Sequence, residues 1–317
     1  MTHILLAVLM AAAVEVKQQS DHIEIAIGGR PFTSYYFGPE VAKSYLMPIQ
    51  TASGVVLSRP FPIGNDTSGG DSKASSFEPH QRPLYFSHGN IDGLNFWGEE
   101  AFQKFYESEH SRQAYGHMGG AKIEQATSGD AGRIAASFAL EDANGRVIGR
   151  EKQSFVFRGD ERTRTIDCEF TIEASDGPLT LGDTKEGTFG IRLGAELSAP
   201  LGHMQNSKGG QGESEIWGKA ADWVNYSGIV GGKQVGIVVF DHPKSFRHPT
   251  TWHARGYGLL AANPFGLREF THDAGQDGSW TIPEGQSLVF RYRVVTYDGK
   301  MPAAEIDKLY REYAATP

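Results

Sequence analysis

Five of the eleven histidines in this 317-residue chain fall in two short segments, 78–89 and 241–257, where aromatic residues are interleaved with them. They are His80 and His88 in the first segment, and His242, His248 and His253 in the second. Imidazole titrates near neutral pH, and each segment has an arginine two residues after a histidine, a side chain suited to binding carboxylates. The pattern favours a site that transfers protons and holds an anionic group.

Alternation assigns faces within each segment. In an extended chain, His80, Arg82 and His88 point one way, and His253, Arg255 and Tyr257 share a face of theirs. We expect the two sets to meet in one pocket, because charged rows facing an apolar core are costly. His80, His88, His253 and Tyr257 are the catalytic candidates, and Arg82 and Arg255 are the substrate-binding ones. Pro83 cannot donate to a ladder, which predicts an edge strand or a bulge there.

Two more segments offer binding groups. Lys185 and Glu186 precede a predicted strand, where a loop end suits site residues and a solvated turn is the alternative. Trp223 and Tyr226 lie in a segment rich in aromatic residues, which suits sugar stacking and a sandwich core equally. A metal site built from His80, His88 and His253 is a competing hypothesis. The chain lacks His-x-His spacing, so we expect no metal and no cofactor.

The elements that position these residues read as strands. Glycine numbers 39, and alternating runs recur along the chain, at 22–27, 33–37, 55–58, 187–197, 234–240, 256–262 and 287–297. Residues 122–174 alternate in three runs separated by turn signals at 142–145 and 159–161, which predicts an antiparallel meander. In its last run, Ile166, Cys168, Phe170 and Ile172 share one face, so the lone cysteine is expected in the core.

Helical patterns are few. A short charged helix is predicted at 99–112. After Pro302, apolar residues follow at helical spacing, which predicts an amphipathic helix at about 303–315. The predicted fold is all-β, a large antiparallel β-sandwich with this C-terminal helix.

Residues 4–13 are apolar and end in three alanines, as a signal peptide does. The predicted organisation is a signal peptide at 1–18 and one domain at 19–317, in a periplasmic or secreted protein. An apolar N-terminal strand in a cytoplasmic protein is the alternative. The net charge is −8 without a basic run, which disfavours nucleic acid and anionic membranes as partners.

Longer runs of sequence add a resemblance. Segments 79–82, 86–89, 183–187, 221–228 and 240–266 resemble a bacterial family catalogued as "methane oxygenase PmoA" domains, over nearly all of the chain after the predicted signal peptide. These runs add His248, Trp252 and Asn263 to the substrate-binding candidates. Gln81 stands where the family usually has a second histidine, so no role carries over to it.

The membrane methane monooxygenase subunit is a bundle of transmembrane helices, and no segment here approaches the ~18 apolar residues that one helix needs. The resemblance therefore implies an exported sandwich of the galactose-mutarotase-like type. It also implies kinship with dehydratases of uronate-containing oligosaccharides.

The resulting hypothesis is a lyase or dehydratase acting on an oligosaccharide or similar sugar. Arg82 or Arg255 would bind a substrate carboxylate, while His88, His253 or Tyr257 takes the neighbouring proton and His80 protonates the departing oxygen. An epimerase-like reaction would use Glu186 as its base. A non-catalytic sugar-binding protein and a metal-dependent oxygenase are the alternatives from other classes.

Overall fold

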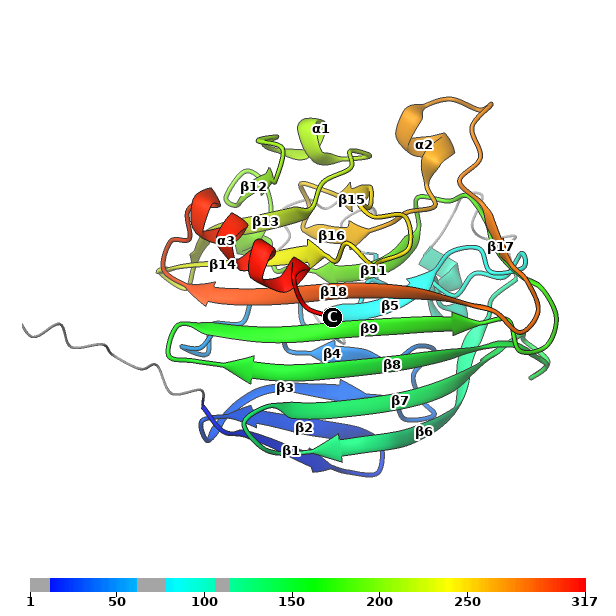
Figure 1. Ribbon diagram of the computed structural model, residues 1–317, viewed down its shortest axis with the longest axis horizontal. Helices are drawn as coiled ribbons and strands as arrows, with labels where there is room; N and C mark the ends of the chain where they lie inside the picture. The colour runs from blue at the N-terminus through cyan, green and yellow to red at the C-terminus, as the bar shows by residue number, and fades with distance from the viewer. Residues whose placement is uncertain (1–11, 62–77, 106–113) are drawn as a thin grey trace, which may run out of the picture.

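Two large antiparallel sheets face each other and enclose one apolar core (Figure 1). The computed structural model describes residues 12–61, 78–105 and 114–317. Within them the strand pairings of both large sheets are antiparallel, and a helix ends the chain. The predicted fold class, an antiparallel β-sandwich with a C-terminal helix, is confirmed.

We call the first sheet sheet A. Its strands, in spatial order, are β1 (Val14–Gln18), β2 (His22–Ile27), β3 (Arg30–Tyr36), β4 (Tyr45–Met47), β5 (Leu84–His88), β11 (Gly187–Arg192), β16 (Leu259–Ala262) and β15 (Trp252–Ala254). Its N-terminal half is a meander, and β11 then enters beside β5 from far along the chain. That crossover puts segments about a hundred residues apart side by side.

Sheet B is the second sheet. Its order is β12 (His203–Asn206), β13 (Trp223–Val230), β14 (Lys233–Asp241), β18 (Ser287–Asp298), β9 (Thr163–Glu173), β8 (Val147–Gly159), β7 (Gly132–Glu141) and β6 (His117–Thr127). A small third sheet pairs β10 (Leu179–Leu181) with β17 (Trp280–Ile282). The predicted meander at 122–174 corresponds to β6 through β9.

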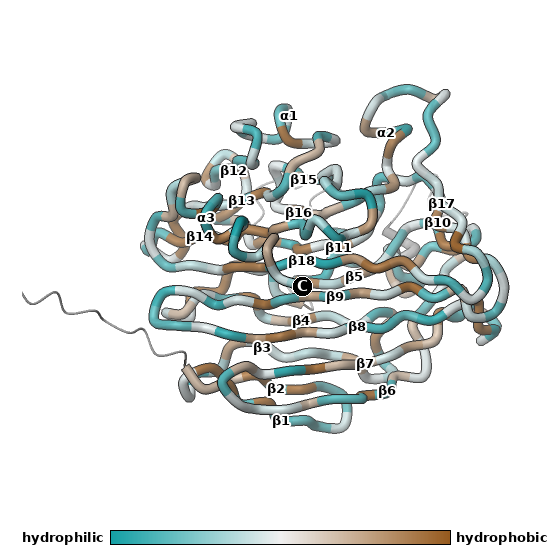
Figure 2. Tube along the Cα trace, in the orientation of Figure 1, coloured by the Kyte–Doolittle hydropathy of each residue, from teal (hydrophilic) through white to brown (hydrophobic). Residues whose placement is uncertain are grey.

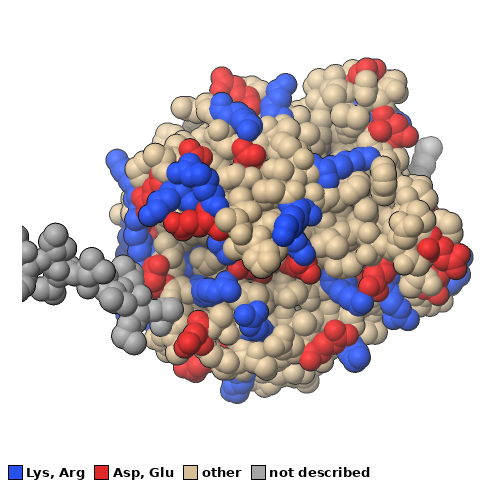
Figure 3. Space-filling model, viewed as in Figure 1, with Lys and Arg blue, Asp and Glu red and all other residues tan. Residues whose placement is uncertain are grey.

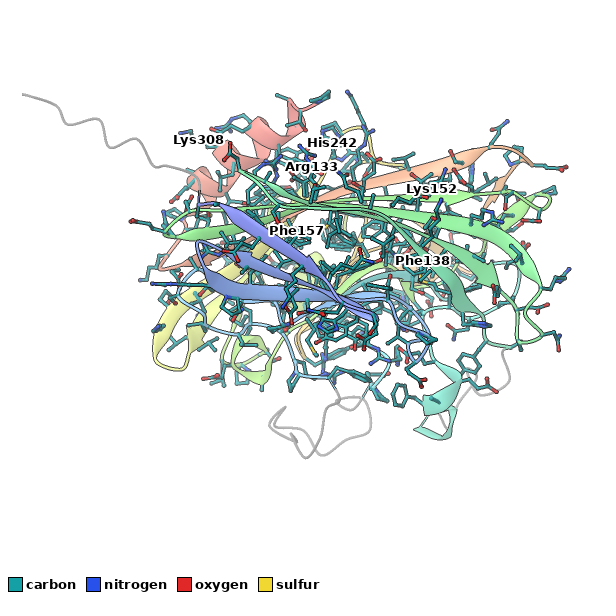
Figure 4. All side chains as sticks on the ribbon, turned by 90° about the horizontal axis from the view of Figure 1, so that it is seen from below. Arg133, Phe138, Lys152, Phe157, His242 and Lys308 are labelled. Carbon is teal, nitrogen blue, oxygen red and sulfur yellow. The ribbon has the colours of Figure 1, made fainter. Side chains whose placement is uncertain are left out.

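Apolar residues on the facing sides of the two sheets form the core. In β9 burial alternates residue by residue, and Cys168 lies inside with Ile166 and Phe170, as predicted. Rings from the two sheets stack directly, with Phe86 of β5 and Phe170 of β9 4.3 Å apart between centroids. Figure 4 shows Phe157 between the sheets and Lys152 on the outward side, and Figure 2 shows the matching alternation of hydropathy along the strands.

The C-terminal helix α3 (Ala303–Ala314) lies on the outward side of sheet B, across β14 and β18 (Figure 1). It buries Ile306 and Tyr313 against Trp223 and Phe240, which confirms the predicted apolar face. Two further short helices, α1 (Glu213–Ile216) and α2 (Leu267–Thr271), were not predicted. No helix in the described part of the chain is long and apolar enough to cross a membrane.

Val14–Gln18 forms β1 and pairs with β2, and residues 1–11 of the predicted signal peptide lie outside the described residues. Two sequence-based element boundaries need correction. Residues 55–58 make isolated bridges instead of a strand. The described part of the helix predicted at 99–112 is the 3-10 helix η2 (Glu100–Phe105), and residues 106–112 lie outside the described residues.

Candidate functional site

Sheet A has an inner face toward sheet B and an outer face on which polar residues gather. In β5, Leu84 and Phe86 belong to the core between the sheets, whereas Tyr85 between them packs on Trp97 on the outer face. In β15, Trp252 and Ala254 face the core, and His253 lies on the outer side. Alternation along the strands therefore decides which candidates can share a site.

The predicted common face of His80, Arg82 and His88 is wrong. His88 follows Phe86 on the inner face, where its ring contacts Phe265 at 4.9 Å and its Nε2 donates to the carbonyl of Gly182 at 2.8 Å. Burial lowers the pKa of His88 to about 4, so it is a neutral core residue. The extended strand begins only after Pro83, so the alternation does not continue back to Arg82. Because Pro83 precedes the strand, its missing N–H removes no hydrogen bond within β5. The strand therefore lies inside the sheet, and the predicted edge position is wrong.

Arg82 lies on the outer face in a buried ionic network. Its Nε donates to Glu99 Oε1 at 2.8 Å, its Nη2 reaches the other oxygen, and its guanidinium lies 3.3 Å from the ring centroid of Phe61. Lys43 Nζ is 3.2 Å from Glu99 Oε1 and donates to the carbonyl of Trp97. Arg82 thus already has a bidentate carboxylate partner inside the protein.

Trp97 covers the middle of the outer face. A side chain at Gly190 of β11 would place its Cβ 2.8 Å from the Trp97 ring and 2.9 Å from that of Tyr85, so the close approach requires glycine there. His80, which is buried, lies edge-on to Trp97 with its Nδ1 3.4 Å from Glu78 Oε2. The first histidine of the predicted catalytic set is therefore on the outer face, beside a carboxylate.

The two histidine segments meet on the outer face through Gln81 and Tyr257. Gln81 Nε2 donates to the Tyr257 hydroxyl at 3.3 Å. Tyr257 belongs to the turn between β15 and β16, and Tyr226 from sheet B holds this turn by hydrogen bonding to the carbonyls of Arg255 and Leu259 at 3.1 and 3.0 Å. Burial raises the pKa of Tyr257 to about 12, so the phenol stays protonated at neutral pH.

The loop at 183–186, just before β11, is fixed by three other elements. Asn263 Nδ2 donates to the carbonyl of Thr184, and His253 Nδ1 donates to that of Lys185, both at 2.8 Å. Glu269 of α2 accepts from the Lys185 amide at 2.6 Å and from its ammonium at 2.8 Å. Asn263 and Lys185 are thus engaged in holding the loop that carries Glu186.

Glu186 lies at the electrostatic centre of this cluster. After burial, the negative charge of Glu186 is the next cause that raises the pKa values of Glu78 and Tyr257, and it favours protonated His253. Gly89, immediately after β5, donates its amide to the Glu186 carbonyl at 2.6 Å. A Cβ at Gly89 would come within 2.8 Å of that oxygen. We call Glu78, His80, Glu186, His253 and Tyr257 the outer-face cluster.

Two members of the cluster have protonation states suited to proton transfer near neutral pH. Burial raises the pKa of Glu78 to about 7, with the charge of Glu186 as the second cause. Burial lowers the pKa of His253, so its imidazole is neutral at that pH. Only an N–H can donate to the Lys185 carbonyl, so Nδ1 carries the proton and Nε2 keeps the basic lone pair.

Arg255 flanks the cluster and is paired. Its Nε lies 2.9 Å from Glu213 Oε1, and its guanidinium is 5.6 Å from the Tyr257 ring centroid. The Arg255 side chain remains about one-third exposed.

The remaining predicted binding residues do not join the cluster. Trp223 lies under α3 and donates to Asp307 at 2.9 Å, Trp252 lies in the core, and the Tyr226 ring lies there too. His248 sits at the other sheet, where its Nδ1 is 2.8 Å from the buried Asp241 Oδ2 and its Nε2 is 3.5 Å from the Tyr310 hydroxyl of α3. Of the aromatic residues of segment 215–226, Tyr226 lies in the core between the sheets and Trp223 packs under α3, whereas Trp217 is partly buried beside His253, with 6.3 Å between ring centroids.

Sequence reasoning missed Arg59, Glu78, Gln81 and Arg192. Glu78 and Gln81 are in the first histidine segment, so their polar neighbours were a usable signal. Arg192 ends β11 on the outer face, and Arg59 pairs with it through the backbone, from a stretch that carries no recognisable motif. Only the crossover of β11 shows that these residues are neighbours.

Other features of the described residues point less clearly to chemistry. Among them, no group of three or more His, Cys, Asp or Glu side chains is arranged to hold a metal ion. A cavity of about 300 Å³ lies beside β12, lined by Gly202, His203, Met204, Gln205, Gln211, Gly212 and Ser227. His203 is its one ionisable side chain, so the outer-face cluster is the better candidate for a reaction.

Comparisons with known proteins give a family and distant structural likenesses. The profile of a family described as a family of unknown function (DUF6807) matches residues 22–311. No curated protein matches the sequence.

Three solved structures show the range of these likenesses. A galactose mutarotase-like protein from Clostridium acetobutylicum is 10% identical, with 92% of this chain and 99% of that chain covered and a TM-score of 0.38. A heparan sulfate lyase HepC mutant from Pedobacter heparinus is 8% identical, with 91% and 37% covered and a TM-score of 0.38. An alpha-galactosidase from Lactobacillus brevis is 9% identical, with 93% and 40% covered and a TM-score of 0.35. Such likenesses say nothing of this chain's chemistry.

Proposed function

This chain belongs to the family of unknown function DUF6807, and for it we propose a carbohydrate-active enzyme of the lyase or dehydratase type. The observation that carries the proposal is the gathering of titratable groups around Glu186: His253 hydrogen-bonds the loop that carries it, and its charge acts on Glu78, His253 and Tyr257, groups from two other segments of the chain. Titratable groups with opposed pKa shifts, gathered on one face, are typical of acid–base sites.

His253 is the proposed base. Its Nδ1–H is held by the Lys185 carbonyl, which leaves Nε2 free of a proton. Because burial lowers the pKa of His253, the ring is ready to accept a proton at neutral pH. The negative charge of Glu186 would then stabilise the imidazolium formed.

Glu78 or Tyr257 is the proposed acid. Glu78 has a pKa of about 7, which keeps much of it protonated at neutral pH, and His80 Nδ1 lies 3.4 Å from its Oε2. Tyr257 is protonated over the same range and is oriented by Gln81. Either group would supply the proton donor that elimination requires in addition to a base.

The reaction balances without a further reactant. The base takes the proton on the carbon next to a substrate carboxylate, and that electron pair forms a carbon–carbon double bond. The bond from the neighbouring carbon to oxygen breaks, and the departing oxygen takes the proton of the acid. Departure of a sugar oxygen makes the enzyme a lyase, and departure of water makes it a dehydratase.

An epimerase-like reaction is the second candidate, favoured by the central position of Glu186. With Glu186 as base and a proton returned to the opposite face, the same groups would invert a carbon centre. Product analysis separates the two, because elimination creates a new ultraviolet absorbance and inversion does not.

The test is a screen of uronate-containing and neutral oligosaccharides, followed by variants of the proposed acid–base groups. With an active substrate, Glu186→Gln and His253→Asn should each lower kcat by about 10²–10⁴-fold. Glu169→Gln, on the outer face of sheet B, is the matched control and should leave kcat unchanged. Unchanged turnover in both Glu186→Gln and His253→Asn would rule out the proposed acid–base function.

The pH profile tests the role of Glu78. An acid must be protonated to act, so kcat/KM should fall as the pH rises through about 7. Glu78→Gln should abolish this limb and leave a low, flat profile across that range. If the limb persists in Glu78→Gln, Glu78 is not the acid and Tyr257 takes that role.

A further inference from the structure

Three aromatic side chains lie together beside the outer-face cluster. They are Trp217, which directly follows α1, Phe270 in α2, and His272 directly after α2. The ring centroids of Trp217 and Phe270 lie 6.3 and 6.2 Å from that of His253, within the range of direct ring contacts. Figure 1 shows α1 and α2 on the same side of the molecule, beyond β15, the strand that carries His253. We call Trp217, Phe270 and His272 the aromatic wall.

The backbone holds Trp217 against β15. The Trp217 amide donates to the Glu213 carbonyl, and the Gly218 amide donates to the Trp252 carbonyl, both at 2.8 Å. Gly218 has a φ of +69°, and a Cβ there would come within 2.9 Å of the Phe270 Cβ, so the turn after the indole requires glycine. The wall is therefore a fixed extension of sheet A next to the proposed base.

The three rings of the wall differ in exposure. Phe270 is buried and lies perpendicular to the indole, with 5.2 Å between centroids. Trp217 is partly exposed, and the exposed His272 stacks on it at 5.5 Å with 28° between the ring planes. The Trp217 Nε1 is buried and has no hydrogen-bond partner among the described residues, although a buried indole N–H usually finds an acceptor. Because His272 is the exposed ring, it is the one that a ligand could displace to reach the indole.

Two ion pairs flank the wall. Arg255 Nε lies 2.9 Å from Glu213 Oε1, and Lys185 Nζ lies 2.8 Å from Glu269 Oε1. Since these neighbouring charges are balanced, the wall favours an uncharged surface over an ionic group. The C–H face of a pyranose ring is such a surface, because its hydrogens carry a partial positive charge that meets the negative face of an aromatic ring.

We infer that the aromatic wall is a sugar-binding subsite, on which the pyranose ring next to the reacting one stacks against Trp217. This inference rests on the proposed function and deepens it, because the substrate then spans at least two rings, from the outer-face cluster to the wall. His253 lies in contact with the indole, so a single glycosidic bond would join the two positions. Trp223 and Tyr226, the sequence-based candidates for stacking, are buried elsewhere and leave this role to Trp217.

A direct binding measurement tests the subsite without turnover. Titration calorimetry on the full chain compares glucose with cellobiose, galactose with lactose, and galacturonate with digalacturonate. At least one disaccharide should bind the wild-type protein about tenfold more tightly than its monosaccharide, because only the disaccharide reaches the wall. Trp217→Ala should weaken the binding of that disaccharide by about 10–100-fold and leave monosaccharide binding unchanged. His272→Ala should act in the same direction with a smaller effect.

Trp280→Ala is the matched control. Trp280 of β17 is 44% exposed, and its ring contacts are Phe246 and Arg247, so it offers an indole that is not part of the wall. This variant should leave every affinity unchanged. Trp217→Leu keeps apolar bulk without a ring face, so it replaces Trp217→Ala if that variant does not fold. The inference is overturned if no disaccharide is preferred, if the preference survives in the Trp217 variant, or if Trp280→Ala abolishes it.

A purely structural role of Trp217 predicts a different pattern. If the indole only held His253 in place, Trp217→Ala would weaken monosaccharide and disaccharide binding alike, and this result would also overturn the subsite. The outcomes separate the subsite from the reaction. A disaccharide preference that depends on Trp217, without turnover of any oligosaccharide, supports the subsite and removes the lyase proposal. Turnover that Trp217→Ala leaves unchanged, with no disaccharide preference, removes the subsite and leaves an acid–base enzyme.

Discussion

The outer faces of the two sheets carry the same kinds of ion pair in very different surroundings. On sheet B, Arg291 Nε lies 2.7 Å from Glu169 Oε2, and Lys152 Nζ lies 2.6 Å from Glu173 Oε1, with side chains between about a quarter and a half exposed. Figure 3 views the molecule from this side and shows acidic and basic side chains interspersed. Water and salt screen such pairs, so each contributes little.

On sheet A, the Lys43–Glu99–Arg82 network lies beneath Trp97 and Phe61 with at most 4% of any of its side chains exposed. Burial lowers the pKa of Lys43 to about 8, although the charge of Glu99 opposes the shift. The comparison shows that burial by neighbouring side chains, and not the type of residue, decides whether an ion pair contributes little to stability or constrains the fold.

The largest expected effect on this comparison comes from Glu99→Ala. It leaves Lys43 and Arg82 buried without their carboxylate, so the free energy of unfolding should fall by about 3–5 kcal/mol. Urea denaturation at neutral pH measures it. A loss below about 1 kcal/mol would mean that the network behaves like a surface pair and that the contrast between the two faces is wrong.

A smaller effect, with a definite pH dependence, is expected at Glu151. This carboxyl points from β8 into the sandwich, where Gln153 Nε2 donates to it at 2.6 Å, and burial raises its pKa to about 8. Between pH 4.5 and about 8 the folded state holds a proton that the unfolded chain has lost, so stability falls as the pH rises through this range.

Glu151→Gln should remove this loss of stability at high pH, because glutamine does not ionise. It should be near neutral at pH 4 and stabilise the protein by a few kcal/mol at pH 9, since each pKa unit corresponds to about 1.4 kcal/mol. Urea denaturation across this pH range gives the two curves. Parallel curves for variant and wild type would show that Glu151 is not held protonated by the fold.

The smallest expected effect is that of Glu169→Gln. Its pair with Arg291 is partly exposed, so the unfolding free energy should change by less than about 1 kcal/mol, and 0.5 M NaCl should reduce the change further. Denaturation at low and high salt provides the measurement. An effect comparable with that of Glu99→Ala would erase the distinction on which the comparison rests.

By itself, the sequence determined the elements whose pattern is local. Alternation at 163–173 placed Cys168 in the core, and helical spacing after Pro302 predicted α3, because a strand or helix packed on one side must repeat with its own period. Polar and aromatic residues also singled out two segments as candidates for a common site, and Gln81 and Tyr257 do join those segments.

Only the tertiary structure decided which of those residues lie together on one face. Pro83 ends the irregular stretch before β5, so Arg82 lies on one face of sheet A and His88 on the other. The alternating pattern of the sequence does not show this change of face. The crossover that sets β11 beside β5 brings Glu186 and Arg192 to Glu78 and Arg59. Such neighbours are separated by about a hundred residues. Their contact depends on the order of strands in the sheet and on burial, and no local repeat in the sequence indicates either.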